Sequence, residues 1–511
     1  MQTGEGMKSP YISDIYSVYV MDGVKRTKLD VYLSLVSDGT GLHPISPEMQ
    51  KEFDEISVAS HVSKSYIAIM ESEEEKTVSV SFKGKCNRMH IENKEYRRKQ
   101  DEIFFKIIPG EVVWIKIDSD YPQSLRVICS RAVRPDLQNN YIEFKPGYYT
   151  IENCAYITEG KRGFPVISDI PDNTTVYIHC GAVINAAFVL ENKHNIRIFG
   201  SGMISTVERC YGIRDNICAP TFLGPLRKYA YPCIFIKTDS SNISIEGITL
   251  NCEFRGVVIR NSENIDISEI KIFSNCVNAD GINMMNARHI KVFDSYIHSH
   301  DDGIAVFTSC DSILYLADKE CAVPLPISSD IEVARCKIIT ACRPFCIGGH
   351  ATGNTNPHDK VENFYAHDLE LINYRYYDVP EIERVKKWSG FLRILSQTEQ
   401  LISNIKFKNV KCFKRTDYEG QPIHIEVRGA ESASYSEGGG YRIENIIFEN
   451  ISFQEKTEID LPSALYCTAN RTEEYAIDGI IFDNITFGNI KMKKSDAFLE
   501  IVGNVKNITV E

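Results

Sequence analysis

One phrase, a polar Asn or Asp followed by alternating apolar residues, recurs from Phe144 onward and constrains the fold more than any other feature. It reads SNISIEGITL from Ser241, ENIDISEIKIF from Glu263 and SNIKFKNVKCF from Ser403. The two clearest copies, YRIENIIFENISF and YAIDGIIFDNITF, match at 8 of 13 positions. Alternation over a few residues is typical of short strands with one buried face, so the chain repeats a strand-rich unit.

The spacing of the phrase predicts a solenoid. It returns at Asn242, Asn264 and His289, an interval of little more than twenty residues that suits a coil of three short strands. Each coil would pair with the next and stack its apolar residues into one core. The recurrent Asn tolerates left-handed backbone and can bond the turn or the Asn of the next coil. Leu is sparse, which disfavours a leucine-rich repeat, and we predict a right-handed parallel β-helix over 136–511.

The N-terminal stretch before this repeat has a different pattern. YSVYVMDGVKRTKLDVYLSLV and KTVSVSFKGK are alternating stretches separated by polar turns at irregular intervals. Such spacing is typical of antiparallel strands packed in two layers. We therefore predict an all-β chain whose N-terminal β-sandwich, residues 1–135, precedes the helix.

Composition excludes some classes of partner. Lys and Arg total 57 against 69 Asp and Glu, a net charge of −12, and no basic run occurs. This balance disfavours nucleic acid and anionic membrane as partners. No apolar stretch reaches the ~18 residues of a membrane span. The first residues lack the apolar core of a secretory signal, so we expect a cytoplasmic protein, or a secreted one if a leader was removed.

Sixteen cysteines are scattered along the chain without a CxxC pair. Several lie inside apolar runs, as Cys233 does in YPCIFIK and Cys346 does in PFCIGG. Buried free thiols behave as small apolar groups. We expect reduced, structural cysteines and a reducing compartment; the sequence indicates no oligomeric state.

Two Asp-bearing turns are the strongest functional signal. NADGIN (Asn278–Asn283) and HDDGIAV (His300–Val306) are separated by the interval of the repeat, which places Asp302 one coil after Asp280. Neighbouring coils lie ~4.8 Å apart. Asp280 should therefore lie beside Asp301 and Asp302 on one exposed face, where like charges raise one another's pKa. A protonated carboxyl beside an ionised one can cleave a glycosidic bond.

These turns have other interpretations. Asx-Gly pairs are ordinary turn chemistry, and Asp oxygens also bind calcium. A solenoid gains no stability from stacked like charges, and the glycine-rich nonapeptide of calcium-binding solenoids does not occur. A catalytic role is favoured, and we predict no metal and no cofactor.

The chain resembles the pectinase-like glycoside hydrolases, families 28 and 49, over about 140–511. Polygalacturonases of family 28 carry Asn-x-Asp and then Asp-Asp one coil later, matched here by Asn278, Asp280, Asp301 and Asp302. FKPGYY (Phe144–Tyr149) and IRIFGSGMI (Ile196–Ile204) also look like the opening coils of that fold. The resemblance implies inverting hydrolysis with Asp301 as general acid, while Asp280 and Asp302 hold the water.

Two departures from the family pattern concern the substrate. The Gly-His-Gly block aligns on CRPFCIGG (Cys342–Gly349), which puts Arg343 at the His position. The Arg-Ile-Lys block aligns on LRIL, which keeps Arg393 but has Leu395 for the lysine that helps to grip a substrate carboxylate. With an acidic cleft, this favours a neutral substrate, of α-glucan type such as dextran. An N-terminal sandwich is similar to the layout of family 49 dextranases and isopullulanases.

The predicted substrate-binding residues are Asn278, His300, Arg343, His350, Arg393 and Trp388. The predicted partner is a carbohydrate. The alternatives are a polygalacturonase-like pectin hydrolase, a polysaccharide lyase, and a carbohydrate-binding solenoid without catalysis. The sequence leaves open the sugar, its linkage and whether cleavage is internal or terminal.

Overall fold

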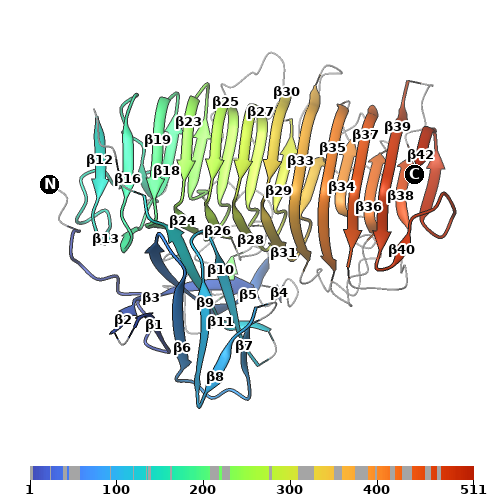
Figure 1. Cartoon of the computed structure of the whole chain (residues 1–511). Coiled ribbons are helices and arrows are strands. Elements are labelled where there is room, and N and C mark those ends of the chain that lie inside the picture. The colour runs from blue at the N-terminus through green and yellow to red at the C-terminus, as the bar shows by residue number, and fades with distance from the viewer. Residues whose placement is uncertain are drawn as a thin grey trace.

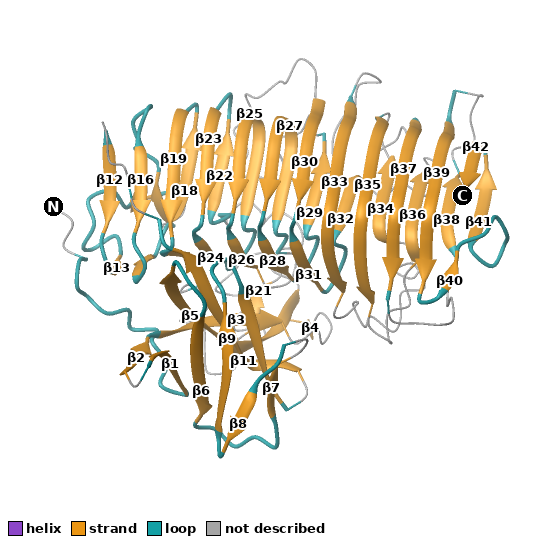
Figure 2. Cartoon of the chain, in the orientation of Figure 1, coloured by secondary structure: helices purple, strands orange, loops and turns teal. Residues whose placement is uncertain are grey.

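The computed structural model describes most of the chain and consists of strands connected by turns (Figure 2). The described residues are 4–23, 25–37, 43–44, 58–91, 94–118, 120–133, 135, 140–160, 164–207, 218–220, 231–274, 279–308, 327–349, 359–373, 390–396, 400–414, 421–428, 440–454, 462–468 and 474–511. Over these ranges there is no helix, hence none long and apolar enough to cross a membrane.

A right-handed parallel β-helix forms the larger part, as predicted, and its axis runs across Figure 1 from β12 to β42. Each coil has three faces, called A, B and C here. Face A contains β12 (Tyr141–Phe144), β16 (Thr175–Ile178), β19 (His194–Gly200), β23 (Ser241–Glu246), β25 (Val257–Ser268), β27 (Ile282–Phe293), β30 (Ile327–Ala334), β33 (Lys360–Asn373), β35 (Leu401–Lys414), β37 (Arg442–Phe453), β39 (Ala476–Phe487) and β42 (Val505–Val510).

Faces B and C complete the coils. Face B contains β13 (Gly147–Tyr149), β17 (Ala182–Ile184), β20 (Met203–Ser205), β24 (Thr249–Asn251), β26 (Lys271–Ser274), β28 (Tyr296–Ser299) and β31 (Lys337–Thr340), continued by the ends of β33, β35, β37 and β39. Face C contains β15 (Pro165–Ile167), β18 (Ala187–Glu191), β22 (Ile234–Lys237), the starts of β25 and β27, β29 (Ile304–Phe307), β32 (Phe345–Gly348), β34 (Gly390–Ser396), β36 (Gln421–Val427), β38 (Ser463–Cys467) and β41 (Leu499–Gly503). The short strands β14 (Thr158–Glu159) and β40 (Ile490–Lys491) pair antiparallel to their neighbours.

Asparagines near the start of the face A strands form a ladder, because their side chains bond from coil to coil. Asn195 Nδ2 donates to Asn173 at 2.9 Å, and Asn404 Nδ2 donates to Asn363 at 3.1 Å. These four have φ between 57° and 58°, the left-handed region that Asn tolerates. The separation between successive ladder residues varies, from 22 residues (Asn173 to Asn195) to 47 (Asn195 to Asn242) and 41 (Asn363 to Asn404), since the coils carry insertions of different lengths. The role predicted for the recurrent Asn is confirmed.

The N-terminal part contains two sheets around a core that includes Tyr16, Val78, Ile103, Ile115 and Val127. The first sheet is β2 (Lys25–Leu29), β1 (Tyr16–Asp22), β6 (Lys76–Phe82), β9 (Glu102–Ile107) and β8 (Arg97–Lys99). The second is β21 (Cys218–Pro220), β5 (Val58–Ser72), β11 (Asp120–Arg131), β10 (Val112–Ile117) and β7 (Met89–Ile91), with β3 (Val31–Ser37) and β4 (His43–Pro44) also on β5.

This second sheet departs from the predicted antiparallel sandwich in two ways. Strands β5 and β11 pair in parallel. Strand β21, which belongs to the β-helix part of the sequence, pairs with β5. The intervening strands β6 to β10 allow β11 to return in the direction of β5, a crossover that local turn signals do not reveal. The sequence divides the chain near residue 135, but the sheets share a strand across that division.

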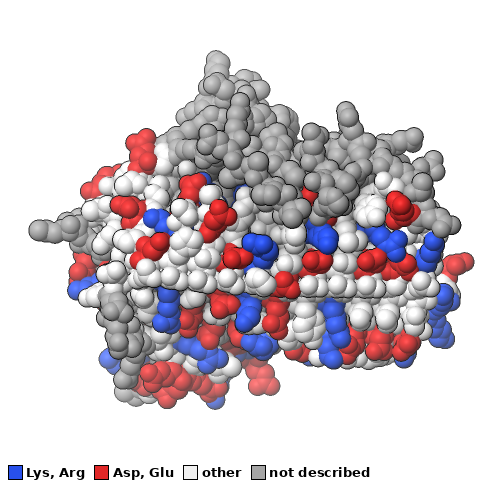
Figure 3. Space-filling view, turned by 90° about the horizontal axis from the view of Figure 1, so that it is seen from above, with Lys and Arg blue, Asp and Glu red and all other residues white. Residues whose placement is uncertain are grey.

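The sandwich packs against face B below the helix in Figure 1. Ile67 and Ile128 of the sandwich form one apolar cluster with Val183, Phe273 and Tyr296 of the helix. Seen from above, acidic and basic side chains are interspersed along the helix (Figure 3). Eleven cysteines whose side chains the structure describes are free, and nine of these eleven are buried.

Candidate active site

Two Asp-bearing turns, each joining face B to face C, lie in register. The Gly281 N–H donates to Asp302 O at 2.9 Å, and the Gly303 N–H donates to Arg343 O at 2.7 Å. One coil earlier, the Gly256 N–H donates to Asp280 O at 3.1 Å. These bonds place Arg255, Asp280, Asp302 and Arg343 on four successive coils, a set called the charged row here.

The glycine after each aspartate is required by close packing of the coils. A Cβ on Gly281 would lie 2.4 Å from the Gly303 oxygen, and a Cβ on Gly303 would lie 2.7 Å from the Pro344 oxygen. Because both contacts are with backbone, no side-chain adjustment could relieve them. The Asp-Gly pairs that resemble simple turn signals thus also permit the stacking of the turns.

The charged row has its basic groups at the ends and the two carboxylates in the middle. Arg255 Nε lies 3.0 Å from Asp280 Oδ2, and Arg343 Nε donates to Asp302 Oδ1 at 2.6 Å. Arg343 Nη2 also lies 3.8 Å from Asp301 Oδ1. Each carboxylate therefore has a guanidinium partner, and Arg343 serves two of them.

The three aspartates come together as predicted, but the exposed face expected for them is wrong. Asp280 is 5% exposed and Asp302 is 3% exposed, while Asp301 is partly exposed. The arginines of the row are themselves 7% and 9% exposed. The prediction did not include the side chains of the flanking coils. Arginines from those coils form ion pairs with the aspartates and cover them.

Burial and charge give the carboxyl groups different pKa values. Burial, together with the nearby Asp301 and Asp302, raises the pKa of Asp280 to about 7 against the effect of Arg255. Burial also raises the pKa of Asp302, although Arg343 opposes it. Asp301 differs: burial raises its pKa, but Arg343 and His300 outweigh burial and lower it. In the free protein at neutral pH, Asp301 is therefore ionised, whereas Asp280 is close to its pKa and is protonated in a fraction of the molecules.

Several hydrogen bonds hold the turn that contains Asp301. Ser299 Oγ donates to Asp301 O at 2.9 Å, and the Thr340 hydroxyl donates to the same oxygen. The Asp302 N–H donates to the Asp301 carboxylate at 3.0 Å. His300 is buried beside Asp301 and acts on it through charge. Within the neighbouring turn, Asp280 Oδ2 accepts a hydrogen bond of 2.7 Å from the side-chain amide of the asparagine three residues later.

Face C beyond the charged row contains the predicted Arg393. It lies on β34, between Cys346 of β32 and His424 of β36 in the strand register. Its side chain is 3% exposed, and its Nε has no hydrogen-bond partner among the described residues. Burial and the nearby Arg343 lower its pKa. Arg393 is thus a buried cation with an unsatisfied donor, next to the carboxylates.

Leu395 follows two residues later and pairs in register with Glu426 of β36. Glu426 accepts from Arg428 Nε at 2.9 Å and lies 3.0 Å from His424 Nε2. Although burial opposes it, hydrogen bonds from His424 and Arg428 lower the pKa of Glu426 to about 2. Where family 28 has a lysine, this chain therefore has an apolar side chain beside a fixed carboxylate.

Arg255 and the group around Glu426 were not predicted. Arg255 precedes Asp280 by one coil of the repeat, so the repeat itself could have indicated it. His424, Glu426 and Arg428 alternate along the chain, a pattern that also occurs on solvated surfaces. Three predicted residues, Asn278, His350 and Trp388, lie outside the described part of the chain.

A metal would find poor ligands here. Ligand atoms of Asp301, Asp302 and Cys342 lie within 4.8 Å of one another. However, Arg343 already pairs with both carboxylates, and burial raises the pKa of the Cys342 thiol well above its usual value. A protonated thiol is a weak metal ligand, so the donor set suits a hydrogen-bonded carboxylate cluster better than a cation.

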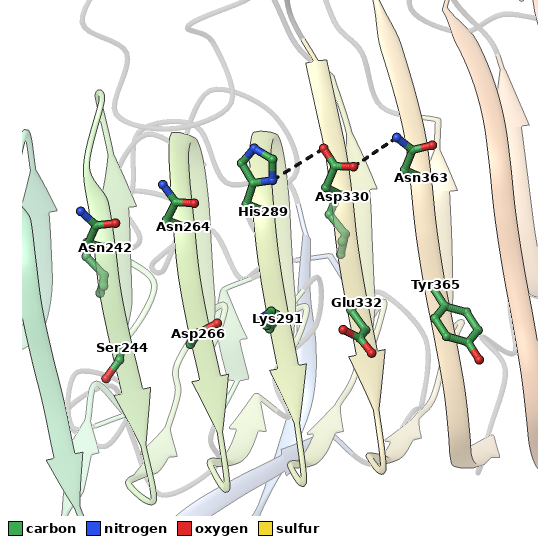
Figure 4. Close-up of a pocket in the computed structure, with 12 residues that line it drawn as sticks. Asn242, Ser244, Asn264, Asp266, His289, Lys291, Asp330, Glu332, Asn363 and Tyr365 are labelled. Atoms are coloured by element: carbon green, nitrogen blue, oxygen red, sulfur yellow. Dashed lines mark hydrogen bonds and ion pairs between the residues drawn. The ribbon is translucent and has the colours of Figure 1, made fainter.

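A shallow groove of about 790 Å³ lies on the outer surface of face A (Figure 4). Polar side chains from five successive strands line it, among them Asn264, Asp266, His289 and Lys291, with Tyr365 at one end. None of the predicted site residues contributes to it. The groove is therefore separate from the carboxylate cluster.

Comparison with known proteins adds three findings. The family model described as "Glycosyl hydrolases family 28" matches residues 188–500. A probable exopolygalacturonase B of Emericella nidulans is 24% identical over 313 residues, 56% of this chain and 60% of that protein. The corresponding protein of Aspergillus terreus is 25% identical over 277 residues, 50% of this chain and 54% of its own length. The chain thus matches little more than half of these relatives.

The fold has a counterpart among solved structures. Dex49A from Penicillium minioluteum superposes with a TM-score of 0.54, covering 100% of this chain and 96% of that chain. Only 13% of the aligned residues are identical, so this likeness concerns the fold.

Proposed function

We propose that this chain, which belongs to glycosyl hydrolase family 28, hydrolyses glycosidic bonds of a uronate-containing polysaccharide. The observation that carries the proposal is the cluster of Asp280, Asp301 and Asp302 on adjacent coils, beside Arg393, whose Nε has no hydrogen-bond partner among the described residues. The carboxylates supply the chemistry of hydrolysis, and the arginine supplies recognition of an acidic sugar.

The reaction follows from the two kinds of carboxyl group. In inverting hydrolysis, one carboxylic acid protonates the leaving oxygen while other carboxylates activate the water that attacks the anomeric carbon. The family resemblance assigns the donor role to Asp301, yet Arg343 keeps Asp301 ionised in the free protein. A substrate carboxylate drawn to Arg343 and Arg393 would weaken that counter-charge and raise the pKa of Asp301. The proton held on Asp280 is then available within the cluster.

Charge around the site supports an acidic substrate. The prediction of a neutral glucan assumed an acidic cleft, but Arg255, Arg343 and Arg393 match the three aspartates in number. A buried arginine with a free donor favours a planar carboxylate, which it can bind through two parallel hydrogen bonds. The curated relatives are named as probable exopolygalacturonases, which agrees with this choice.

A neutral α-glucan is the second candidate, and one observation favours it. Leu395 occupies the position where the family places a lysine, and the fixed carboxylate of Glu426 on the neighbouring strand repels a uronate. Under this alternative, Arg393 would bind sugar hydroxyls.

One comparison separates the two candidates. We expect kcat/KM for oligogalacturonates to exceed that for dextran oligosaccharides at matched ionic strength, with inverted product seen by proton NMR. Arg393→Ala should remove the preference by raising KM for the uronate. A wild-type enzyme that cleaves dextran and ignores every uronate oligomer would establish the second candidate instead.

A further inference from the structure

A buried contact between an arginine and a histidine joins the N-terminal sandwich to the strand that leads into the Asp301 turn. Arg126 of β11 and His298 of β28 are both 0% exposed. Arg126 Nη2 lies 3.1 Å from His298 Nδ1. The two residues are 172 positions apart in the sequence, so the contact exists only because the sandwich docks on face B.

Further groups of the sandwich fix the histidine ring. Trp114 meets the ring edge to face at 4.9 Å between centroids, and Arg126 lies 5.1 Å from the centre of the Trp114 ring. Lys116 Nζ lies 4.5 Å from the same Trp114 ring. Burial and the charges of Arg126, Lys116 and His300 lower the pKa of His298 well below its usual value. The ring is therefore neutral, and its Nδ1 accepts the N–H of Arg126.

His298 is close to the reacting groups along the chain. Two residues separate it from Asp301, and the intervening Ser299 donates its hydroxyl to Asp301 O. Strand β28 pairs with β26 on one side and β31 on the other, so its end has little freedom. A displacement of His298 is consequently passed on to the turn that contains the carboxylates.

The chemistry of this contact is unusual for the interface in which it lies. The neighbouring contacts are apolar and include Ile67, Ile128, Phe273 and Tyr296. Apolar side chains would hold two units together at less desolvation cost than a fully buried guanidinium. A directed hydrogen bond, in contrast, fixes the orientation of one ring. Such a bond is useful where a small displacement of a side chain lowers the reaction rate.

We propose that the N-terminal sandwich is a positioning element of the active site, with Arg126 as the positioning residue that acts through His298. The inference rests on the proposed function, since it concerns the geometry of the Asp301 turn. Misplacement of a catalytic group by ~1 Å can cost ~10²-fold in rate. The sandwich is thus part of the catalytic unit and not a separate carbohydrate-binding module.

The test compares two buried cations of the same interface in the full chain. Arg126→Met removes the contact with His298. The control, Lys271→Met, removes a cation that donates to Gly247 O at 3.1 Å and to Ser130 Oγ at 3.3 Å, without contacting His298. For Arg126→Met we expect kcat to fall ~10- to 100-fold with KM within ~2-fold. For Lys271→Met, kcat should stay within ~2-fold, while urea unfolding shows that both variants are folded. Arg126→Lys, which keeps a donor, should recover part of the rate.

The outcomes separate this inference from the proposed function. Wild-type turnover tests the function; the ratio of variant to wild-type kcat, on whichever glycan the wild type cleaves, tests the positioning role. Equal kcat losses in the two methionine variants, or an unchanged kcat in folded Arg126→Met, would overturn the inference. If Arg126→Met does not fold, His298→Asn, which keeps an acceptor, and His298→Leu, which does not, replace it. The inference then requires the Leu variant to lose at least ~10-fold more kcat.

Discussion

The helix contains two stacks of polar side chains, each built one coil apart, with opposite consequences. Near the start of the face A strands, Asn404 donates an amide hydrogen to Asn363 at 3.1 Å, and Asn445 donates one to Asn404 at 3.3 Å. Between faces B and C, Asp280 and Asp302 occupy equivalent positions on adjacent coils. An amide carries both a donor and an acceptor, so an Asn stack satisfies itself, whereas carboxylates can only accept and must recruit partners.

The difference shows how one backbone geometry serves both stability and reactivity. The Asn ladder is exposed and neutral, and its members need nothing beyond the next coil. The aspartates are buried and depend on Arg255 and Arg343 from flanking coils, and Asp280 still keeps a raised pKa. A stack that cannot satisfy itself holds an exchangeable proton, which is what hydrolysis requires.

Substitution inside the acidic stack should have the largest effect. Asp301→Asn removes the proposed proton donor while the amide preserves the turn, so we expect kcat to fall at least ~10²-fold with substrate binding retained. Asp266→Asn, an exposed carboxylate on face A, is the matched control and should leave kcat unchanged. An aryl glycoside with a good leaving group should restore much of the lost rate. Wild-type turnover of a natural oligosaccharide by Asp301→Asn would contradict the assignment.

Loss of Arg393 should have the next largest effect. Arg393→Ala leaves a substrate carboxylate without its partner, and truncating one side of a buried charge pair costs about 2–5 kcal/mol. We therefore expect KM for oligogalacturonates to rise by at least ~10-fold, with a smaller change for a neutral oligosaccharide. Isothermal titration with a non-cleaved uronate would check the affinity directly. Equal weakening towards both ligands would contradict carboxylate recognition.

The proton on Asp280 should be visible in the pH dependence of stability. The folded pKa of about 7 lies above the ordinary value of 3.8, so this group stabilises the fold most below pH 3.8 and loses that contribution as pH rises through 7. Asp280→Asn mimics the neutral form and should gain stability relative to the wild type as pH rises from about 5 to about 8. Urea unfolding at a series of pH values measures the difference. A constant difference across this range would mean that Asp280 is ionised throughout.

The Asn ladder should give the smallest effect, confined to stability. Asn404→Ala removes one bond to Asn363 and one from Asn445 and places Ala at φ 57°. We expect a loss of about 1–3 kcal/mol in the free energy of unfolding. Asn404→Gly, which accepts that φ, should lose less. Both variants should keep wild-type kcat, because the ladder does not contact the carboxylates. A fall in kcat would show that the Asn ladder also affects catalysis by the aspartates.

The solenoid and its aligned aspartates could be predicted because both depend on separations of one coil. The step from Asp280 to Asp302 equals the step from Ile282 to Ile304, two residues that pair in register on neighbouring strands. The family alignment also predicted Arg343 as a site residue, but it did not predict that Arg343 pairs with Asp302. Burial of these groups could not be predicted, since it depends on side chains from coils on both sides.

What the sequence alone determined is the repeating part: alternating strands, left-handed Asn turns, and carboxylates on adjacent coils. In a parallel solenoid, a short separation in sequence becomes a fixed distance in space, so pattern and position are equivalent. Only the tertiary structure decided the environment of that site. Arg393 reaches the carboxylates across insertions of varied length, and Arg126 reaches His298 across 172 residues, from a separate sheet. No repeat relates those residues, and their contacts arise from packing of distant segments.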